Sequence, residues 1–433
     1  MQALLSYDQS PPLAAPFRFF LTAPIYAFLA GILLLWSGPE IFLSRWTPGI
    51  LALTHLMTVG FMMQVMLGAM VQILPVVAGA NMIGPLWVSR VVHTLINLGT
   101  LFLVAGFLSF KPWVFQLAVL LLVVGVLAFV FAAARALYGV PATSPIITGL
   151  KVSLAGLCVT VGLGAALAAV FGWSLNLPLL QLADVHLVWG FAGWGMVLLA
   201  AVACVVVPMF QLTPSYPKWF ERRFPPLLLS LIVLWSLADF FLPAIVASLG
   251  VAVIVLMAVV FSVLTLNIQR QSKRPNFDAT QRYWRAGMVC TLAASAIWFA
   301  AQHLSVASEW QGWPLLCGVL LIFGGFMSVI VGMLYKIFPF LIWLHLQNHG
   351  MGRVMAPNMK KIIVEAAMLR QMRAHFISCL LLLLAVVWPE YLVYASGVAL
   401  IVSNGMLMRN LLSGMSVYRE HLAKIRTSTT AVS

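Results

Sequence analysis

Twelve long apolar stretches constrain this chain more than any other feature. A helix that spans a bilayer needs roughly 20 mostly apolar residues, and its backbone amides must be hydrogen-bonded within the segment because lipid offers no partner. The sequence therefore predicts an all-α, polytopic membrane protein with about twelve transmembrane helices. Their expected positions are 18–37, 50–75, 88–109, 114–137, 147–172, 184–209, 224–242, 244–267, 284–305, 314–343, 371–388 and 391–411.

The composition agrees with this prediction. Hydrophobic residues make up 63% of the chain and charged residues only 8%, whereas a soluble domain carries about a quarter charged residues. A water-soluble enzyme is therefore excluded. The five cysteines lie inside apolar segments and form no Cys-x-x-Cys pair, which is typical of buried small side chains rather than of disulfides or thiolate metal sites. They are Cys158, Cys204, Cys290, Cys317 and Cys379.

The distribution of basic residues predicts the orientation. If the N-terminus is cytoplasmic, only Arg45 and Lys111 of the 24 Lys and Arg lie on the outer side of the membrane, and the other 22 lie inside. Positive residues favour the cytoplasmic side, so we expect a bacterial-type inner-membrane protein with both termini in the cytoplasm. The formal net charge of +14 then reflects topology and favours anionic lipid as a partner. The Lys and Arg residues form no basic stripe, so a nucleic-acid partner is not expected.

A repeat is expected within one transmembrane domain that covers residues 1–433. The second span ends in GAMVQILP at Pro75, the tenth ends in GMLYKIFP at Pro339, and the sixth ends similarly at Pro208. These prolines are 133 and 131 residues apart, which predicts three pseudo-repeated four-helix arcs. The alternative is that Gly and Pro are simply frequent in membrane helices. The approximate repeats are 1–85, 86–215 and 216–345, with closing helices over 371–411 and a cytoplasmic tail over 414–433.

The architecture and one motif resemble subunit I of the haem-copper oxidases. That family's second helix carries a haem-ligating His, Met- and Phe-rich sequence, then Gly, a Pro and Gly-Ala-x-Asp-Met-x-x-Pro. The second span here has a similar series, in which Asn81 replaces the Asp. It consists of His55-Leu-Met, Phe61-Met-Met, Gly68, Leu74-Pro75, Gly79-Ala80-Asn81-Met82 and Pro85. His186-Leu-Val-Trp189 in the sixth span is similar to the family's HLFWFF stretch.

Several ligands of that family are missing from this chain. Trp194 falls near the position of a copper-ligating His, and the spans 224–242 and 314–343 contain no His. The turn at 388–390 lacks the paired Arg residues that meet haem propionates. The chain therefore resembles divergent, copper-free relatives such as the NnrS-like haem membrane proteins. This resemblance implies haem b, electron transfer or handling of nitric oxide or oxygen, and an electron donor or respiratory partner. A complete oxygen-reducing oxidase is not expected.

Three histidines are the candidate axial ligands of the haem iron. In the expected topology His55 and His186 begin spans that enter from the outside, and His303 ends a span that reaches the outside. A neutral imidazole is a standard ligand of haem iron. The alternative is that histidines at the membrane edge simply face lipid headgroups.

Other residues near these histidines fit a macrocycle. Gly60 and Gly190 follow the first two histidines and are expected to leave room for a ring to approach the backbone. Arg45 is one of only two outer cations and is the expected partner of a propionate.

The remaining candidates support alternatives. Four histidines are expected at the inner boundary of the membrane: His93, His345, His349 and His375. We favour the interpretation that they anchor the protein at the interface, and the alternative is that they form a proton-entry or ligand-binding patch. Met62, Met66 and Met70 share one helical face, and thioethers suit copper(I), although Met stripes usually fill gaps in packing. The second hypothesis is therefore a transporter or copper-insertion factor that uses Met and His residues. A third is a structural partner of a respiratory complex.

Overall fold

The computed structural model describes residues 9–141, 144–350 and 354–430, and within these ranges it contains helices and turns without a strand. Among the described residues, twelve helices are long and apolar enough to cross a membrane, which confirms the expected fold class and number of spans. They are α1 (Ala14–Ser37), α2–η3–α3 (Pro48–Ala78), α4 (Pro85–Ser109), α5 (Pro112–Tyr138), α6 (Pro145–Trp173), α7–η4–α8 (Leu179–Gln211), α9 (Lys218–Phe241), α10 (Ala244–Arg270), α11 (Ala279–His303), α13–η5–α14 (Trp313–Gly350), α16 (Glu365–Val387) and α17 (Pro389–Thr430). Shorter elements are η2 (Pro39–Leu43), α12 (Ser305–Glu309) and α15 (Met359–Ile362).

Proline defines where many of these helices begin. Pro48, Pro85, Pro112, Pro145 and Pro389 are each the first residue of a spanning helix. A proline is favourable there because the first turn of a helix has no internal partner for its N–H groups and needs the φ angle that proline already has. The boundaries of these spans are therefore readable from the sequence to within a few residues.

The last helix is longer than expected. We predicted a span over 391–411 and a separate tail from residue 414, but α17 continues without interruption for 42 residues to Thr430. At 1.5 Å per residue it measures roughly 60 Å, about twice the thickness of the hydrocarbon core of a bilayer. The tail sequence is polar but rich in good helix formers such as Lys, Arg and Glu, so it extends the helix after the apolar part ends.

The contacts between Cα atoms divide the chain into two compact units, which we describe separately. Unit 1 consists of residues 1–10, 71–276 and 288–317, and unit 2 of residues 11–70, 277–287 and 318–433. Three spans pass from one unit to the other, because the boundaries fall within the second span, within α11 and within the tenth span. The repeats expected from the sequence stay a prediction.

Unit 1 is built around α6, which packs on α5, on the sixth span and on α9. One close contact joins α6 to the sixth span, where the carbonyl group of Gly193 lies in the space that a Cβ on Gly156 would need. Polar side chains link the same unit through bonds such as Gln269 Nε2 to Gln211 Oε1 at 2.9 Å. The Tyr216 hydroxyl lies 3.0 Å from Thr265 Oγ1, and burial raises the pKa of Tyr216, so it stays a neutral hydrogen-bonding group.

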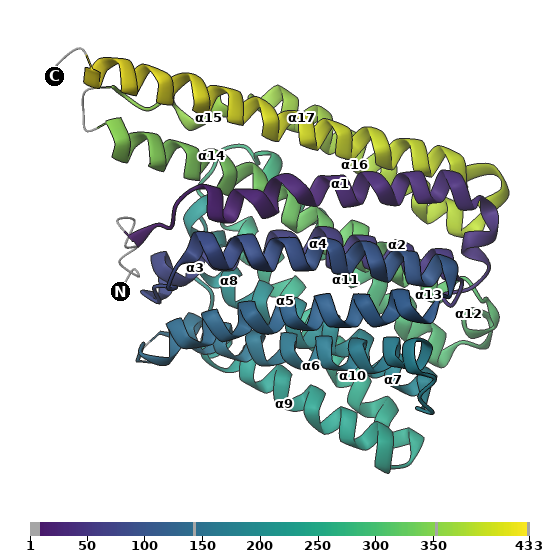
Figure 1. The fold of residues 1–433 in the computed structure, drawn as a ribbon. Coiled ribbons are helices and arrows are strands. Elements are labelled where there is room, and N and C mark those ends of the chain that lie inside the picture. Colours follow the sequence, from purple (N-terminus) through teal and green to yellow (C-terminus); the bar gives the residue numbers. More distant parts are fainter. Residues whose placement is uncertain (1–8, 142–143, 351–353, 431–433) are drawn as a thin grey trace. The chain divides into compact units, whose positions relative to one another are not determined.

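Unit 2 contains the first and last spans side by side. Figure 1 shows α1 and α17 running along one another, and their contact is among the most extensive in the chain. The contact depends on two glycines: a Cβ on Gly31 would lie 2.7 Å from the carbonyl oxygen of Gly397, and a Cβ on Gly397 would lie 2.9 Å from that of Gly31. Small residues allow this approach, since helices in lipid associate through close backbone packing.

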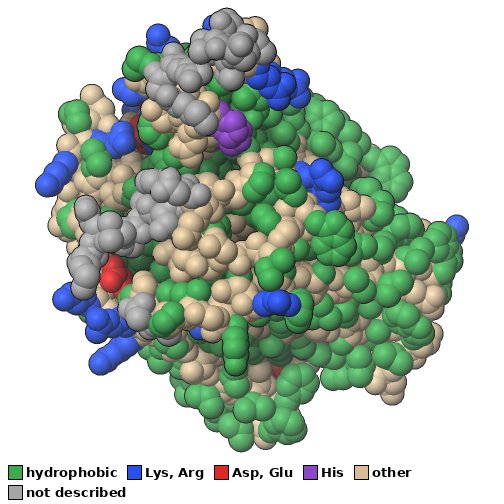
Figure 2. Space-filling view, turned by 60° about the vertical axis from the view of Figure 1, so that its left-hand side comes forward, with side chains coloured by type: hydrophobic (Ala, Val, Ile, Leu, Met, Phe, Trp, Pro, Cys, Tyr) green, Lys and Arg blue, Asp and Glu red, His purple; other side chains and the backbone are tan. Residues whose placement is uncertain are grey.

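Three spans are more deeply buried than the rest. In the second, sixth and tenth spans, 89%, 67% and 72% of the apolar window is buried, whereas no other span in the described part of the chain exceeds 56%. Figure 2 shows one face of the molecule, on which hydrophobic side chains dominate, Lys and Arg side chains are scattered, and acidic side chains are few. The three buried spans are those with the related Gly and Pro sequences, so they are the first place to look for a functional site.

Candidate functional site

Each of the three deeply buried spans contains an eight-residue π-helical segment. The segments are η3 (Leu56–Met63), η4 (Trp189–Met196) and η5 (Leu320–Met327). Each begins 19 residues before the proline of its own span, at Pro75, Pro208 and Pro339. π-helical segments are rare and occur frequently at functional sites. The constant distance between the π-helical segment and the proline is therefore a second feature, besides the prolines themselves, that repeats in these three spans.

His55 is the last residue of α2 (Pro48–His55) and directly precedes η3. Its Nδ1 lies 2.7 Å from the carbonyl oxygen of Leu51. Because a carbonyl oxygen only accepts, Nδ1 carries the proton, and in the neutral ring Nε2 then holds the lone pair. Metal-ligating histidines are commonly held in this way, with the other ring nitrogen donating to a backbone carbonyl. The half-buried imidazole of His55 therefore has the tautomer that a metal ligand needs.

His186 is held by the same chemistry in unit 1. It lies in α7 (Leu179–Val188), three residues before η4, and its Nδ1 is 3.0 Å from the carbonyl oxygen of Thr160 in α6. Its ring packs against Gly164 of α6, where a Cβ would lie 3.0 Å from the ring. When the prolines of the two spans are aligned, His186 stands two positions earlier than His55. The two histidines share a tautomer but not a register position.

The other predicted residues have surface surroundings. His303 ends α11 as an exposed side chain whose ring centroid lies 4.3 Å from that of Phe299. Arg45 lies between η2 and α2 with its guanidinium 4.4 Å from the centre of the Trp46 ring, which is a cation–π contact.

The two glycines differ in how much space they leave. The ring of Tyr26 in α1 lies directly against Gly60, on the side where a Cβ would stand. The space that we expected beside Gly60 for a macrocycle is therefore filled by Tyr26. At Gly190 the nearest neighbour of a Cβ would be the methyl carbon of Thr160 at 3.5 Å, which is ordinary van der Waals contact.

In the part of the chain that the structure describes, no three His, Cys, Asp or Glu side chains form a group that could hold a metal ion. Ligation by one or two of the predicted histidines stays a prediction. The methionines Met62, Met66 and Met70 are all buried in unit 2. This burial agrees with side chains that fill gaps in the packing of the span.

The sequence did not reveal a buried polar network in unit 2, centred on Gln371 of α16. Tyr283 of α11 donates to Gln371 Oε1 at 2.6 Å, and Tyr335 of α14 (Ser328–Gly350) donates to the same oxygen at 3.1 Å. Asn410 of α17 donates to the Tyr335 hydroxyl at 2.8 Å, and Gln371 Nε2 lies 3.3 Å from both oxygens of Ser403. Four helices are thus joined by hydrogen bonds in an apolar interior.

His375 lies one helical turn after Gln371 and extends this polar face. It is only 2% exposed, and its Nε2 is 2.8 Å from Ser328 Oγ, the first residue after η5. The Ser328 hydroxyl is also 3.3 Å from the carbonyl oxygen of Phe323 within η5. Ser328 therefore connects the imidazole to the π-helical backbone. We expected His375 to anchor the membrane boundary, and this expectation was wrong because its helix is turned to bury the ring.

A signal for this network exists in the sequence. Gln371, His375 and Ser378 are spaced by four and three residues, so they share one face of α16, and all three are buried. The remaining partners lie on three other helices, between 32 and 88 residues away. Periodicity indicates the polar face but does not indicate which helices it meets.

We expect Ser328→Ala to destabilise the protein by about 1–3 kcal/mol, since it leaves the buried Nε2 of His375 without its partner. Thermal unfolding of the detergent-solubilised protein measures this effect. Ser416→Ala is the matched control, because Ser416 is exposed on α17 and bonds only its own helix backbone. Equal stability of the two variants would contradict the prediction.

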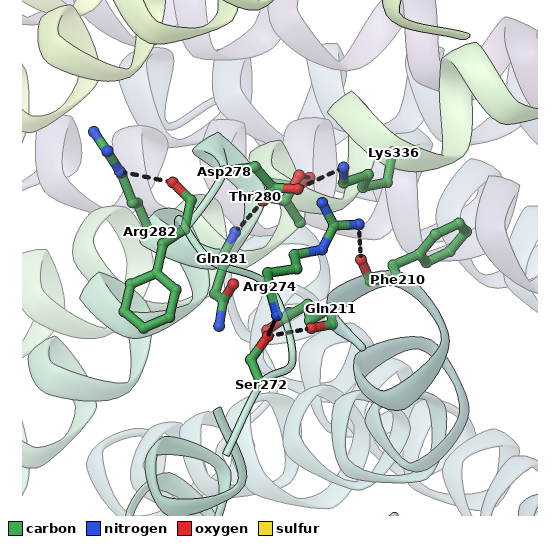
Figure 3. Close-up of polar contacts among 11 residues, drawn as sticks. Phe210, Gln211, Ser272, Arg274, Asp278, Thr280, Gln281, Arg282 and Lys336 are labelled. Carbon is green, nitrogen blue, oxygen red and sulfur yellow. Dashed lines mark hydrogen bonds and ion pairs between the residues drawn. The ribbon is translucent and has the colours of Figure 1, made fainter. Parts of the chain in front are cut away.

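Polar contacts also occur where helices end (Figure 3). In unit 2, Lys336 Nζ lies 2.6 Å from Asp278 Oδ2, and the backbone N–H of Gln281 donates to Asp278 Oδ1 at 3.0 Å. In unit 1, Arg274 donates to the carbonyl oxygen of Phe210 at 2.9 Å, and Ser272 donates to that of Gln211 at 2.6 Å. The first two contacts hold Asp278, just before α11, against Lys336 within α14, and the other two hold the loop after α10 against the end of α8.

Comparisons of the chain with protein-family models and with curated proteins find no match. The likeness to the haem-copper oxidases and the NnrS-like proteins therefore rests on the residues quoted from the sequence and stays a prediction.

Proposed function

We propose that this membrane protein binds haem b through an axial imidazole from His55 and takes part in electron transfer or in handling nitric oxide or oxygen. The observation that carries the proposal is the hydrogen bond from His55 Nδ1 to the Leu51 carbonyl oxygen, which places the lone pair of the neutral ring on Nε2, the nitrogen that would ligate iron. The position of His55, beside a π-helical segment in the most buried span, supports the same conclusion.

His186 is the second residue that fits an axial ligand. Its Nδ1 is also held by a backbone carbonyl oxygen, so its Nε2 has the same ligating character. His303 lacks this support because it is exposed. When bound, the haem supplies an iron centre that exchanges electrons and binds small gases. The protein's own part is to hold the ligating ring in one tautomer and orientation.

Absorption spectroscopy of protein purified from haem-sufficient cells tests the proposal. Wild-type protein should show a Soret band that shifts on reduction, and His55→Ala should lose it while retaining the wild-type gel-filtration profile. His303→Ala is the matched control and should keep the band. A colourless wild-type protein, or an unchanged spectrum in folded His55→Ala, would overturn the proposal.

A further inference from the structure

A pair of histidines at the polar end of α14 lies outside the proposed haem site. His345 and His349 are four residues apart on one helical face, and their ring centroids are 4.0 Å apart with an angle of 25° between the planes. The continuous helix Trp313–Gly350 has 38 residues, roughly 57 Å at 1.5 Å per residue, so it extends beyond a bilayer core of about 30 Å. Its last turn carries the exposed side chains of Gln347, Asn348 and His349, which places this end in a polar environment.

Hydrogen bonds define how both rings are held. His349 Nδ1 lies 2.9 Å from the carbonyl oxygen of His345, so Nδ1 is the donor and Nε2 holds the lone pair of the neutral ring. His345 Nδ1 lies 3.2 Å from the hydroxyl of Tyr418 in α17, and the Tyr418 ring is 5.5 Å from that of His345. An oxygen atom thus faces Nδ1 in both rings, as for histidines that ligate metals through Nε2.

We infer that His345 and His349 chelate one divalent late first-row metal ion, of which Zn²⁺ is the representative, through their Nε2 atoms. Two histidines spaced i, i+4 on a helix are a known zinc-binding arrangement. Zn–N bonds of about 2.0–2.1 Å in a tetrahedral site place two ligand nitrogens roughly 3.3 Å apart, and the centroids of the two rings are already only 4.0 Å apart. The half-buried His345 is the fixed member of the pair, and the exposed His349 is the member that adjusts.

The surroundings define the kind of site. No third His, Cys, Asp or Glu joins the pair within the described residues, so water completes the coordination, and the metal exchanges rather than serving as a permanent structural ion. The charge of Arg426, in the same part of α17, acts on Tyr418 and repels a cation, which weakens binding. Imidazole ligands select Zn²⁺, Ni²⁺ or Cu²⁺ over Mg²⁺ and Ca²⁺, which prefer oxygen ligands.

Calorimetric titration of the tag-free, detergent-solubilised protein with Zn²⁺ tests the inference. Wild-type protein should bind Zn²⁺ but not Mg²⁺ under the same conditions, and His349→Ala and His345→Ala should each bind one equivalent less than wild type. Tyr418→Phe should keep the site but weaken it by about 10–100-fold, as expected when the hydrogen bond that orients a metal ligand is lost. His303→Ala, which removes a solitary exposed histidine, should bind as wild type does.

The same titration of His55→Ala separates this inference from the proposed function, because zinc binding at the pair should persist without haem. Wild-type protein that binds no Zn²⁺ would overturn the inference. Unchanged stoichiometry in both His345→Ala and His349→Ala would overturn it as well.

Discussion

Gly156→Val should lower the stability of the folded protein by at least about 3 kcal/mol, the upper end of what overpacking usually costs. The reason is the contact between α6 and the sixth span, where the Gly193 carbonyl occupies the space that any side chain at residue 156 would need. A flexible neighbour could rotate away, but a backbone carbonyl within a π-helical segment moves only with its helix. The midpoint of thermal unfolding in detergent is the measurement.

Gly162→Val is the matched control for this prediction. It places the same side chain in the same helix, but at an exposed position where a Cβ meets no atom within 4 Å. We expect its unfolding midpoint to stay near that of wild type, since exposed substitutions usually change stability by no more than about 0.5 kcal/mol. If both valine variants unfold at the same temperature, the helices are not as close at Gly156 as the structure places them.

Gln371→Leu should destabilise the protein by about 2–4 kcal/mol. Leucine has a similar volume, but Tyr283 and Tyr335 both donate to Gln371 Oε1 in the buried interior of unit 2. Each hydroxyl that loses its acceptor costs about 1–3 kcal/mol when no water replaces it. Chemical or thermal unfolding of the purified variant against wild type gives the difference.

Two further variants separate lost hydrogen bonds from altered packing. Gln271→Leu makes the same replacement at an exposed glutamine at the end of α10 and should be neutral. Adding Tyr283→Phe to Gln371→Leu removes one of the two unpaired hydroxyls, so it should recover part of the lost stability. A double variant that is less stable than Gln371→Leu alone would contradict the network as we describe it.

The predicted site residues show that sequence periodicity identifies candidate histidines but does not predict their tertiary contacts. His55 and His186 were identified because they stand at the start of related spans, but their ring tautomers depend on the carbonyls of Leu51 and Thr160. Thr160 is 26 residues before His186 and belongs to another helix. The filling of the space beside Gly60 by Tyr26 likewise depends on how α1 packs, which no pattern within the second span reveals.

The sequence alone determined the number of spans, most of their limits and the shared register of Pro75, Pro208 and Pro339, because apolar length and proline act locally. The tertiary structure decided which side of each helix is buried. It turned His375 inward onto Ser328, filled the space at Gly60, and brought His345 together with Tyr418, 73 residues away. The physical reason is that in a chain with 63% hydrophobic residues nearly every helix face is apolar, so hydrophobicity does not distinguish lipid from protein neighbours. Close packing and hydrogen bonds between helices make that choice.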